Sequence, residues 1–460
     1  MSRCPAFGLA LAGTLLSTGA LATPLSETAA GMAPGTFAEL TPMNGWDSGV
    51  ILTTPDVPSC SPSDYITQYA EKAAWDPIGR RILFVGQSHG SCYGGRFVSY
   101  TDATNTWTEE PWLPGICKSG SGSNPCFNHG YDHSTVDPAT GDFYYRHYNS
   151  RKVFRFREGS WTQLPEPDTE SVGCCGALEF FPELHRLIFI DGDWGVWAFD
   201  PGANTWEQLA NTSSEAVKGL PNLPVPPTSG FALYNPVAKV MIFGGDDHLH
   251  RLDSSGHFET LRAPPQTLGV THSVMSFDPV SGSYIVLTNA AMYQYDALAD
   301  AWATVNVSVP PTLRARDGVG DGLIQAPITN YGVIAYAKYD FEQSKVVLYK
   351  HSPSDGGLVG AGGSGGEGGS AGEGGSGSGG ASGSGSGGVS SGGGMSGSGS
   401  VGGRGGVAGA GGTSSAAPSS AAGDDGGCGC RVGSSVAGVR WLALAAAALA
   451  IGLRRRMRSS

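Results

Sequence analysis

Apolar segments and polar turns alternate through residues 34–351 in a pattern that repeats six times. In the clearest copy the segment Phe180–Leu184 contains a strand and a Pro-centred turn, and His185–Ile190 is a second apolar strand. A third strand, Gly195–Asp200, and a fourth, Asn204–Leu209, complete the unit. A unit of four short strands cannot bury both of its faces alone. The repetition therefore predicts a ring of stacked four-stranded sheets.

The turn that follows the first strand recurs in every unit. Most copies have Pro at the second position, which presets its φ, and Asp or Asn before it, which can bond the turn backbone. We place these turns at 76–79, 137–141, 181–184, 235–238, 278–282 and 340–343. The continuous apolar segments after them predict inner strands that are covered on both faces. These strands are expected at 82–85, 143–145, 187–190, 240–243, 284–287 and 346–349.

An aromatic residue starts each expected fourth strand, at intervals of 44 to 54 residues: Trp107, Trp161, Trp206, Phe258 and Trp302. The sixth unit ends near His351 without such a strand, but Gly35–Leu40 has the same pattern as Asn204–Leu209. We predict an all-β, six-bladed β-propeller that this N-terminal strand closes, with Phe37 beside Val346. Seven blades are the alternative if residues 313–328 contain a degenerate unit.

Three segments show a more specific similarity. Val196–Trp206 resembles a Kelch repeat, as do Tyr100–Trp107 and the segment from Gly244-Gly245 to Asp253. The resemblance extends over about residues 33–351 and implies a Kelch-type propeller like the central domain of galactose oxidase. Only one double Gly is retained, so the repeats are divergent. Kelch propellers serve both as binding platforms and as enzymes, so the resemblance predicts a fold and not a function.

The two flanks of this body have other compositions. Arg3, the apolar run 6–21 and the small residues up to Ala22 predict a secretory signal peptide over 1–22, cut after Ala22. Gly, Ser and Ala alternate through 353–427, and such a sequence cannot bury enough apolar surface to fold. We therefore expect the propeller at 33–352 and a disordered linker at 353–427.

Residues 428–460 contain three features in order: Cys428 and Cys430, an apolar stretch at 441–453 expected to form a short helix, and an Arg cluster at 454–458. This order resembles the MYXO-CTERM sorting tail of myxobacterial surface proteins. It implies processing at the Cys motif by sorting machinery, membrane contact before processing, and display at the cell surface or release. A plain C-terminal transmembrane anchor is the alternative, and whether the tail is cleaved stays open. Both place the body outside the inner membrane.

The charge of the body narrows the choice of partners. The formal net charge is −12, and seven Arg but no acidic residue lie in 1–22 and 428–460, which leaves −19 for residues 23–427. Such an acidic body repels phosphate backbones, so we expect no nucleic-acid partner. Cation binding or solubility explains the charge better.

The two faces of the ring are expected to differ. Loops between second and third strands, and loops between blades, emerge on one face, which we call the long-loop face. The other connections are brief and define the short-turn face. Because the long loops carry the Cys, His and Asp residues, we predict the site on the long-loop face.

All six cysteines of the body belong to the long-loop face. Cys117 with Cys126, and Cys60 with Cys92, are candidate disulfides after export. Cys174 and Cys175 are adjacent in the sequence, and they either form a vicinal disulfide or remain thiols. These cysteines show no CxxC spacing, so a metal site is the weaker interpretation.

The same face carries candidate ligand or metal residues: His129, Asp132, His133, Asp246, Asp247, His248 and His272. Imidazole with carboxylate suits a divalent metal, which is the one cofactor we consider. Solvated loop residues are the alternative. Trp112 and Trp194 are candidates for stacking on sugar rings, with ordinary packing as the alternative.

No motif names a reaction. A copper-radical oxidase like galactose oxidase needs a Tyr-His pair, and here Thr271 precedes His272. The chain also has no G-x-S-x-G, HExxH or P-loop. The preferred interpretation is an exported, surface-displayed binding platform for an extracellular glycan or protein. An extracellular metal-assisted or carbohydrate-modifying enzyme, with its His and Asp groups at the mouth of the channel, is the alternative.

Overall fold

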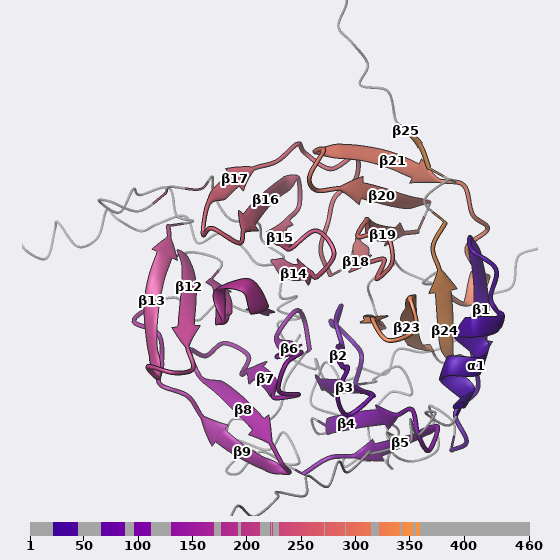
Figure 1. The fold of residues 1–460 in the computed structure, drawn as a ribbon, viewed down its shortest axis with the longest axis horizontal. Helices are drawn as coiled ribbons and strands as arrows, with labels where there is room; N and C mark the ends of the chain where they lie inside the picture. The colour runs from indigo at the N-terminus through magenta and orange to yellow at the C-terminus, as the bar shows by residue number, and fades with distance from the viewer. Residues whose placement is uncertain are drawn as a thin grey trace, which may run out of the picture. The chain divides into compact units, whose positions relative to one another are not determined.

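Six antiparallel sheets form a ring around a central axis (Figure 1). The computed structural model describes residues 22–44, 66–87, 96–111, 130–169, 176–191, 195–211, 221, 223, 230–270, 272–289, 291–313, 322–340, 343–352 and 356–358. All of these residues belong to one compact unit. The first strand of each blade contacts the first strands of both neighbouring blades, so the ring is closed. The predicted six-bladed all-β propeller is confirmed.

The blades follow the chain order. Blade I contains β2 (Ala74–Asp76), β3 (Arg81–Gly86), β4 (Arg96–Thr101) and β5 (Thr106–Glu109). Blade II contains β6 (Ser134–Val136), β7 (Phe143–Arg146), β8 (Val153–Arg157) and β9 (Ser160–Gln163). Blade III contains β10 (Ala177–Phe181), β11 (Arg186–Asp191), β12 (Gly195–Asp200) and β13 (Thr205–Ala210), with the 3-10 turn η2 (Pro182–Leu184).

The second half of the ring repeats this order. Blade IV contains β14 (Phe231–Asn235), β15 (Val240–Gly245), β16 (His248–Asp253) and β17 (Phe258–Thr260). Blade V contains β18 (Ser273–Phe277), β19 (Tyr284–Thr288), β20 (Met292–Asp296) and β21 (Ala301–Val305), and β25 (Gly356–Leu358) pairs with β21. The 3-10 turn η3 (Pro311–Leu313) precedes blade VI, which contains β22 (Leu323–Ile328), β23 (Val333–Asp340), β24 (Gln343–Lys350) and β1 (Thr36–Leu40).

The turns form as their residue types predict. In blade I the Asp76 carboxylate accepts the backbone N–H of Ile78 at 3.0 Å and of Gly79 at 2.9 Å. In blade IV the Asn235 side-chain oxygen accepts the N–H groups of the two residues in the same positions. These local bonds satisfy turn donors that the sheets leave unpaired.

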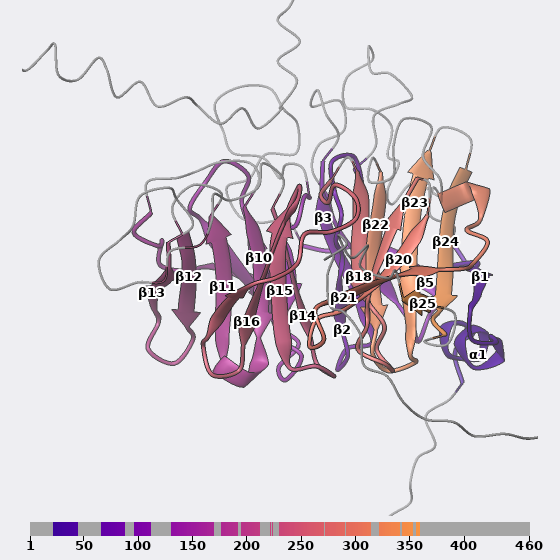
Figure 2. The same cartoon turned by 90° about the horizontal axis from the view of Figure 1, so that it is seen from above.

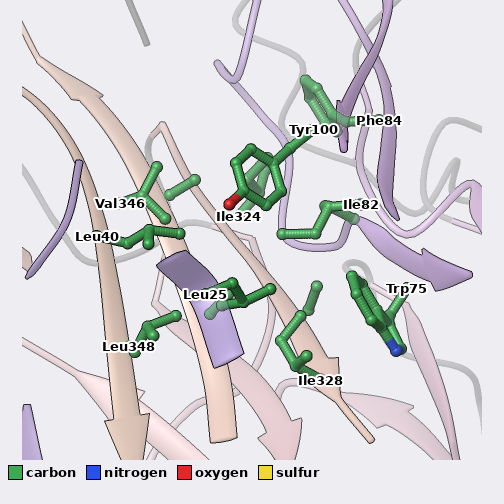
Figure 3. Packing of buried hydrophobic residues seen from close by; sticks show 14 of the residues in the cluster. Leu25, Leu40, Trp75, Ile82, Phe84, Tyr100, Ile324, Ile328, Val346 and Leu348 are labelled. Carbon is green, nitrogen blue, oxygen red and sulfur yellow. The ribbon is translucent and has the colours of Figure 1, made fainter. Parts of the chain in front are cut away.

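The core of the ring is divided among its blade interfaces. Six apolar clusters are present in the described residues, and each joins two neighbouring blades. The cluster between blades VI and I includes Ile82 and Tyr100 on one side and Ile324 and Val346 on the other (Figure 3). Each blade is therefore stabilised by its neighbours, as in other repeat proteins.

The fourth strands add a polar contact to two of these interfaces. The indole N–H of Trp161 in blade II donates to the Pro111 carbonyl, which follows blade I, at 2.8 Å. Trp206 of blade III makes the equivalent bond to the Pro165 carbonyl at 2.6 Å. The aromatic residue that starts a fourth strand thus joins its blade to the one before.

The N-terminal segment closes the ring, as predicted. Strand β1 pairs antiparallel with β24, with Leu40 opposite Val346 and Phe37 opposite Tyr349. The predicted pairing of Phe37 with Val346 is therefore wrong, because Phe37 lies opposite a residue three positions further along β24. In the observed register the Phe37 and Tyr349 rings lie 4.6 Å apart and Leu40 is buried in the core.

A short helix, α1 (Pro24–Gly31), precedes β1 and lies at the short-turn face (Figure 2). Leu25 and Ala29 of α1 pack into the cluster between blades VI and I (Figure 3). The Thr23 side chain caps α1, and its hydroxyl donates to Asp102 at 2.5 Å. Arg80 and Tyr331 donate to the other oxygen of Asp102, so this buried carboxylate joins α1 to blades I and VI. We call α1 and β1, with Thr23, the N-terminal clasp.

Blade VI differs from its predicted boundaries. Residues 340–343 join β23 to β24 and are not the first turn of the blade, and 346–349 belong to the third strand instead of the second. Residues 323–328 supply the first strand, so they are not part of a seventh blade. Pro327 lies inside this strand, which is tolerated because the first strand of a blade is a sheet edge facing the axis.

The flanking segments lie largely outside the described residues. These include residues 1–21 of the predicted signal peptide 1–22, most of the predicted linker and the whole of 428–460, with Cys428, Cys430 and the expected C-terminal helix. Ala22, the residue before the predicted cut, is exposed. No helix within the described ranges is long and apolar enough to cross a membrane.

Candidate functional site

A buried lysine lies at the axis and contacts four blades. Lys72 comes just before β2, and its ammonium nitrogen lies 2.5 Å from Asp132 Oδ1 and 3.1 Å from Glu179 Oε2. The same nitrogen lies 2.8 Å from the Leu178 carbonyl and 3.0 Å from the Ala232 carbonyl. The Lys72 backbone also bridges to Gln325 of blade VI. We call Glu71, Lys72, Asp132 and Glu179 the axial ion cluster.

Burial changes the titration of this cluster. Burial raises the pKa of Asp132 to about 7, although Lys72 opposes the rise. Burial, with the negative charge of Asp132, also holds the pKa of Glu71 well above its usual range. Burial opposes the charged form of Lys72, but Asp132 and Glu179 together raise its pKa above the ordinary value. The two carboxylates therefore favour the ammonium form of Lys72, and burial favours the protonated form of Glu71.

A cavity of about 200 Å³ lies on the axis beside this cluster. Lys72 and Glu179 line its inner end, and the residues around its mouth come from the first turns of several blades. Its walls are mainly apolar. They include four aromatic residues, Trp75, Phe180, Tyr234 and Phe277, and four prolines, Pro77, Pro138, Pro236 and Pro327. The cavity therefore opens on the short-turn face, opposite to the face that the sequence predicts for the site.

The polar floor of the cavity is held by internal bonds. Glu179 Oε1 accepts the Thr135 hydroxyl at 2.7 Å and the Phe180 N–H at 3.1 Å, and Oε2 accepts Lys72. The Trp75 indole N–H donates to Asn330 at 2.7 Å, which fixes that ring in the wall. An apolar cavity with a few fixed polar groups is the usual form of a small-ligand site.

Two of the predicted ligand residues lie near the axis, in different roles. Asp132 is buried and forms the ion pair with Lys72. His133 is completely buried, with its Nε2 3.0 Å from an Arg146 guanidinium nitrogen and its ring 5.3 Å from that of Tyr131. The structure thus places Asp132 in a salt bridge and His133 beside a cation.

The other described candidates lie at the loops of blades IV and V. Asp247 Oδ1 lies 2.6 Å from His248 Nδ1 at an exposed turn. Asp246 pairs through its backbone with Leu268, and His272 is exposed just before β18. Among the described residues no group of three or more His, Cys, Asp or Glu side chains is arranged to hold a metal ion. His129, Trp112, Trp194 and all six body cysteines, Cys60, Cys92, Cys117, Cys126, Cys174 and Cys175, lie outside these residues.

One further histidine gives a prediction for stability. Burial, with the neighbouring His248, lowers the pKa of His250 from 6.5 to about 4. Between these values the unfolded chain binds more protons, so stability should fall as the pH drops from about 6.5 towards 4. The expected loss is at most roughly 3 kcal/mol. It can be measured by urea unfolding at pH 7, 6 and 5.

The test compares variants, because Asp132 titrates in the opposite sense. We expect His250→Phe to remove this part of the pH dependence, since the ring packs beside Phe243 and Phe keeps its bulk. The exposed His257 of the same blade gives the control, His257→Asn, which should leave the slope unchanged. Equal slopes in wild type and His250→Phe would contradict the assignment.

Sequence reasoning missed the axial ion cluster, although the chain contains a signal for it. Glu179 is the charged residue of the otherwise apolar strand β10, and the pair Glu71-Lys72 lies one residue before the buried strand β2. A charge inside a fully buried strand needs a partner of opposite sign. Applied to the sequence, that rule predicts an ion pair between Lys72 and Glu179 across the ring.

Comparisons with known proteins do not assign the chain to a family. No protein-family model matches the chain, and no curated protein matches it. Many solved structures are similar. One, a structural genomics protein of unknown function from Bacteroides thetaiotaomicron, is 11% identical with a TM-score of 0.43, over 68% of this chain and 75% of that one.

Two further structures have printed functions. An auxiliary nutrient binding protein from Bacteroides ovatus is 9% identical with a TM-score of 0.38, over 62% of this chain and 69% of that one. Virginiamycin B lyase from Staphylococcus aureus is 10% identical with a TM-score of 0.37, over 68% and 88%. At this distance neither function transfers.

Proposed function

We propose that the protein is an exported binding protein whose axial cavity takes a small ligand. The observation that carries this proposal is the cavity itself, with apolar walls and a hydrogen-bonded polar floor of Lys72, Thr135 and Glu179. The walls come from the first strands and turns of all six blades. Because neighbouring blades pack through buried clusters, such a cavity is preformed and needs little reorganisation on binding.

Export is the second part of the proposal. The signal peptide is predicted to end at Ala22, and the next residue, Thr23, caps α1. A chain cut at this point keeps the whole N-terminal clasp. The tail at 428–460, with its resemblance to a sorting signal, supports display at the cell surface or release.

A larger partner, an extracellular glycan or protein, is proposed for the long-loop face. A Kelch-type origin of the ring fits this role, and the double Gly supports it. Gly244 has a φ of +158°, and an added Cβ would lie 2.1 Å from the His248 carbonyl oxygen. Gly is therefore needed where the Kelch pattern has it.

Binding in the cavity can be tested with four probes: benzyl alcohol, benzylammonium, methyl glucoside and methyl galactoside. Thr329 lies exposed at the rim, so Thr329→Trp should block the mouth without disturbing the core. Thr104→Trp, on an exposed turn between β4 and β5, is the matched control. We expect ligand-observed NMR to show at least one probe bound to wild type and to Thr104→Trp, with at least tenfold weaker binding to Thr329→Trp. No binding at 10–20 mM, or binding that Thr329→Trp leaves intact, would contradict the proposal.

A further inference from the structure

Within the described residues, the two donors of the polar floor, Lys72 and Thr135, are already bonded to oxygen atoms of the protein. The Lys72 ammonium group has three protons, and four oxygen atoms of the protein lie within 3.1 Å of it. Two of these oxygens are carboxylates, so an anionic ligand would also meet negative charge. The single cation of the floor is therefore committed to the protein.

The same floor keeps an acceptor available. A carboxylate has about four lone-pair positions, and within the described residues the bonds from Thr135, Phe180 and Lys72 occupy three of those of Glu179. The Glu179 side chain is 10% exposed and lines the cavity, so its remaining position is reached from there. Asp132 lies behind Lys72 and adds a second carboxylate to the same end of the cavity.

The walls suit a positive charge with an apolar body. Trp75, Phe180, Tyr234 and Phe277 surround the cavity. Aromatic faces attract an ammonium group by roughly 0.5–2 kcal/mol each, and more strongly when water is excluded. A neutral apolar ligand gains from the same burial but not from the aromatic faces or the carboxylates.

We propose that the axial cavity binds a small organic ammonium ion, with its charge at Glu179 and its apolar part between the aromatic walls. This inference rests on the proposed function, because it assigns the class of ligand to the same cavity. A cavity of about 200 Å³ is smaller than the roughly 300–1,000 Å³ of drug-sized sites, so the ligand is an amine or an amine headgroup of modest size. The acidic body, at a net charge of −12 for the whole chain, attracts such a cation.

Two probes of equal size separate charge from shape. Benzylammonium and benzyl alcohol differ in the charged group, and both fit the cavity. We expect wild-type protein at pH 7 and low salt to bind benzylammonium at least tenfold more tightly than benzyl alcohol, as measured by ligand-observed NMR titration or calorimetry. Equal affinities, with both blocked by Thr329→Trp, would overturn the ammonium inference and leave the cavity as a binding site. Binding of neither of these two probes would overturn the ammonium inference, and binding of none of the four probes would overturn the proposed function as well.

The variant Glu179→Gln tests the residue that is proposed to hold the charge. It keeps the side-chain shape, so benzyl alcohol should still bind within about twofold of wild type, which also shows that the cavity has folded. Benzylammonium should lose at least fivefold in affinity. Glu158→Gln, on an exposed turn of the short-turn face, is the control and should change neither probe. An unchanged preference for benzylammonium in Glu179→Gln would contradict the role of this carboxylate. If the variant binds neither probe and has lost its near-ultraviolet circular dichroism, Glu179→Asp, which keeps the charge, must retain the preference or the proposal falls.

Discussion

Replacing Lys72 by Met is expected to destabilise the folded ring by about 3–5 kcal/mol. The substitution keeps the length of the side chain and removes its charge, which leaves Asp132 and Glu179 without their common partner. It also leaves two carbonyl oxygens, of Leu178 and Ala232, without a donor at the axis. Lys72 is 3% exposed, so water from the cavity can replace only a small part of the lost bonds.

Urea unfolding at pH 7 measures this effect, and two further variants show its origin. The triple variant Lys72→Met, Asp132→Asn, Glu179→Gln should recover part of the loss, because it removes the uncompensated charges together with the lysine. Lys345→Met removes a surface lysine whose ion pair with Glu39 is partly exposed, and it should cost at most about 1 kcal/mol. If Lys72→Met is no less stable than Lys345→Met, the axial ion cluster does not stabilise the ring.

Removal of the N-terminal clasp should have an effect at least as large. A chain that begins at residue 45 lacks β1, so the backbone groups of β24 that pair with Thr36–Leu40 become an open edge. It also lacks Leu25, Ala29 and Leu40 from the cluster between blades VI and I. The loss of two buried leucines alone costs about 4–10 kcal/mol, since each Leu→Ala change in a core costs roughly 2–5 kcal/mol.

Scanning calorimetry can compare a chain that begins at Thr23 with one that begins at residue 45. We expect the shorter chain to unfold at a clearly lower temperature, or to aggregate through its open edge. Met43→Ala, at a side chain that is 80% exposed within the same segment, should leave the unfolding temperature unchanged. Equal unfolding temperatures for the two chains would show that the clasp does not close the ring.

The fold could be predicted because its signals are local. A turn such as Asp76–Gly79 forms through bonds within four residues, and an aromatic residue such as Trp161 recurs near the start of each fourth strand. The predicted boundaries of blade VI are wrong because its first turn lacks the Asp-Pro pair, while residues 340–343 resemble a first turn. The six repeats were sufficient to predict closure, but the register of β1 depends on which side chains reach the core.

The candidate site could be predicted only in small part. Asp132 was recognised as a chemically notable residue, but its partners Lys72 and Glu179 lie 60 and 47 residues away in the chain. The ring brings them together because the first strands of blades I, II and III meet at the axis. A long-range ion pair of this kind leaves no periodic pattern. The sequence analysis does not predict a site on the short-turn face because the turns there are brief. The cavity is formed by the strands behind those turns.

The pairing of β25 with β21 has a mechanical consequence for an anchored protein. Three residue pairs join Gly356–Leu358 to blade V, after the chain has left β24. If the tail attaches the chain to a surface, tension travelling back from the anchor meets these pairs before it reaches β24, the strand that holds the clasp. Such tension would separate β25 from β21 first. The pairing of β1 with β24, which closes the ring, would carry no load until those three residue pairs had separated.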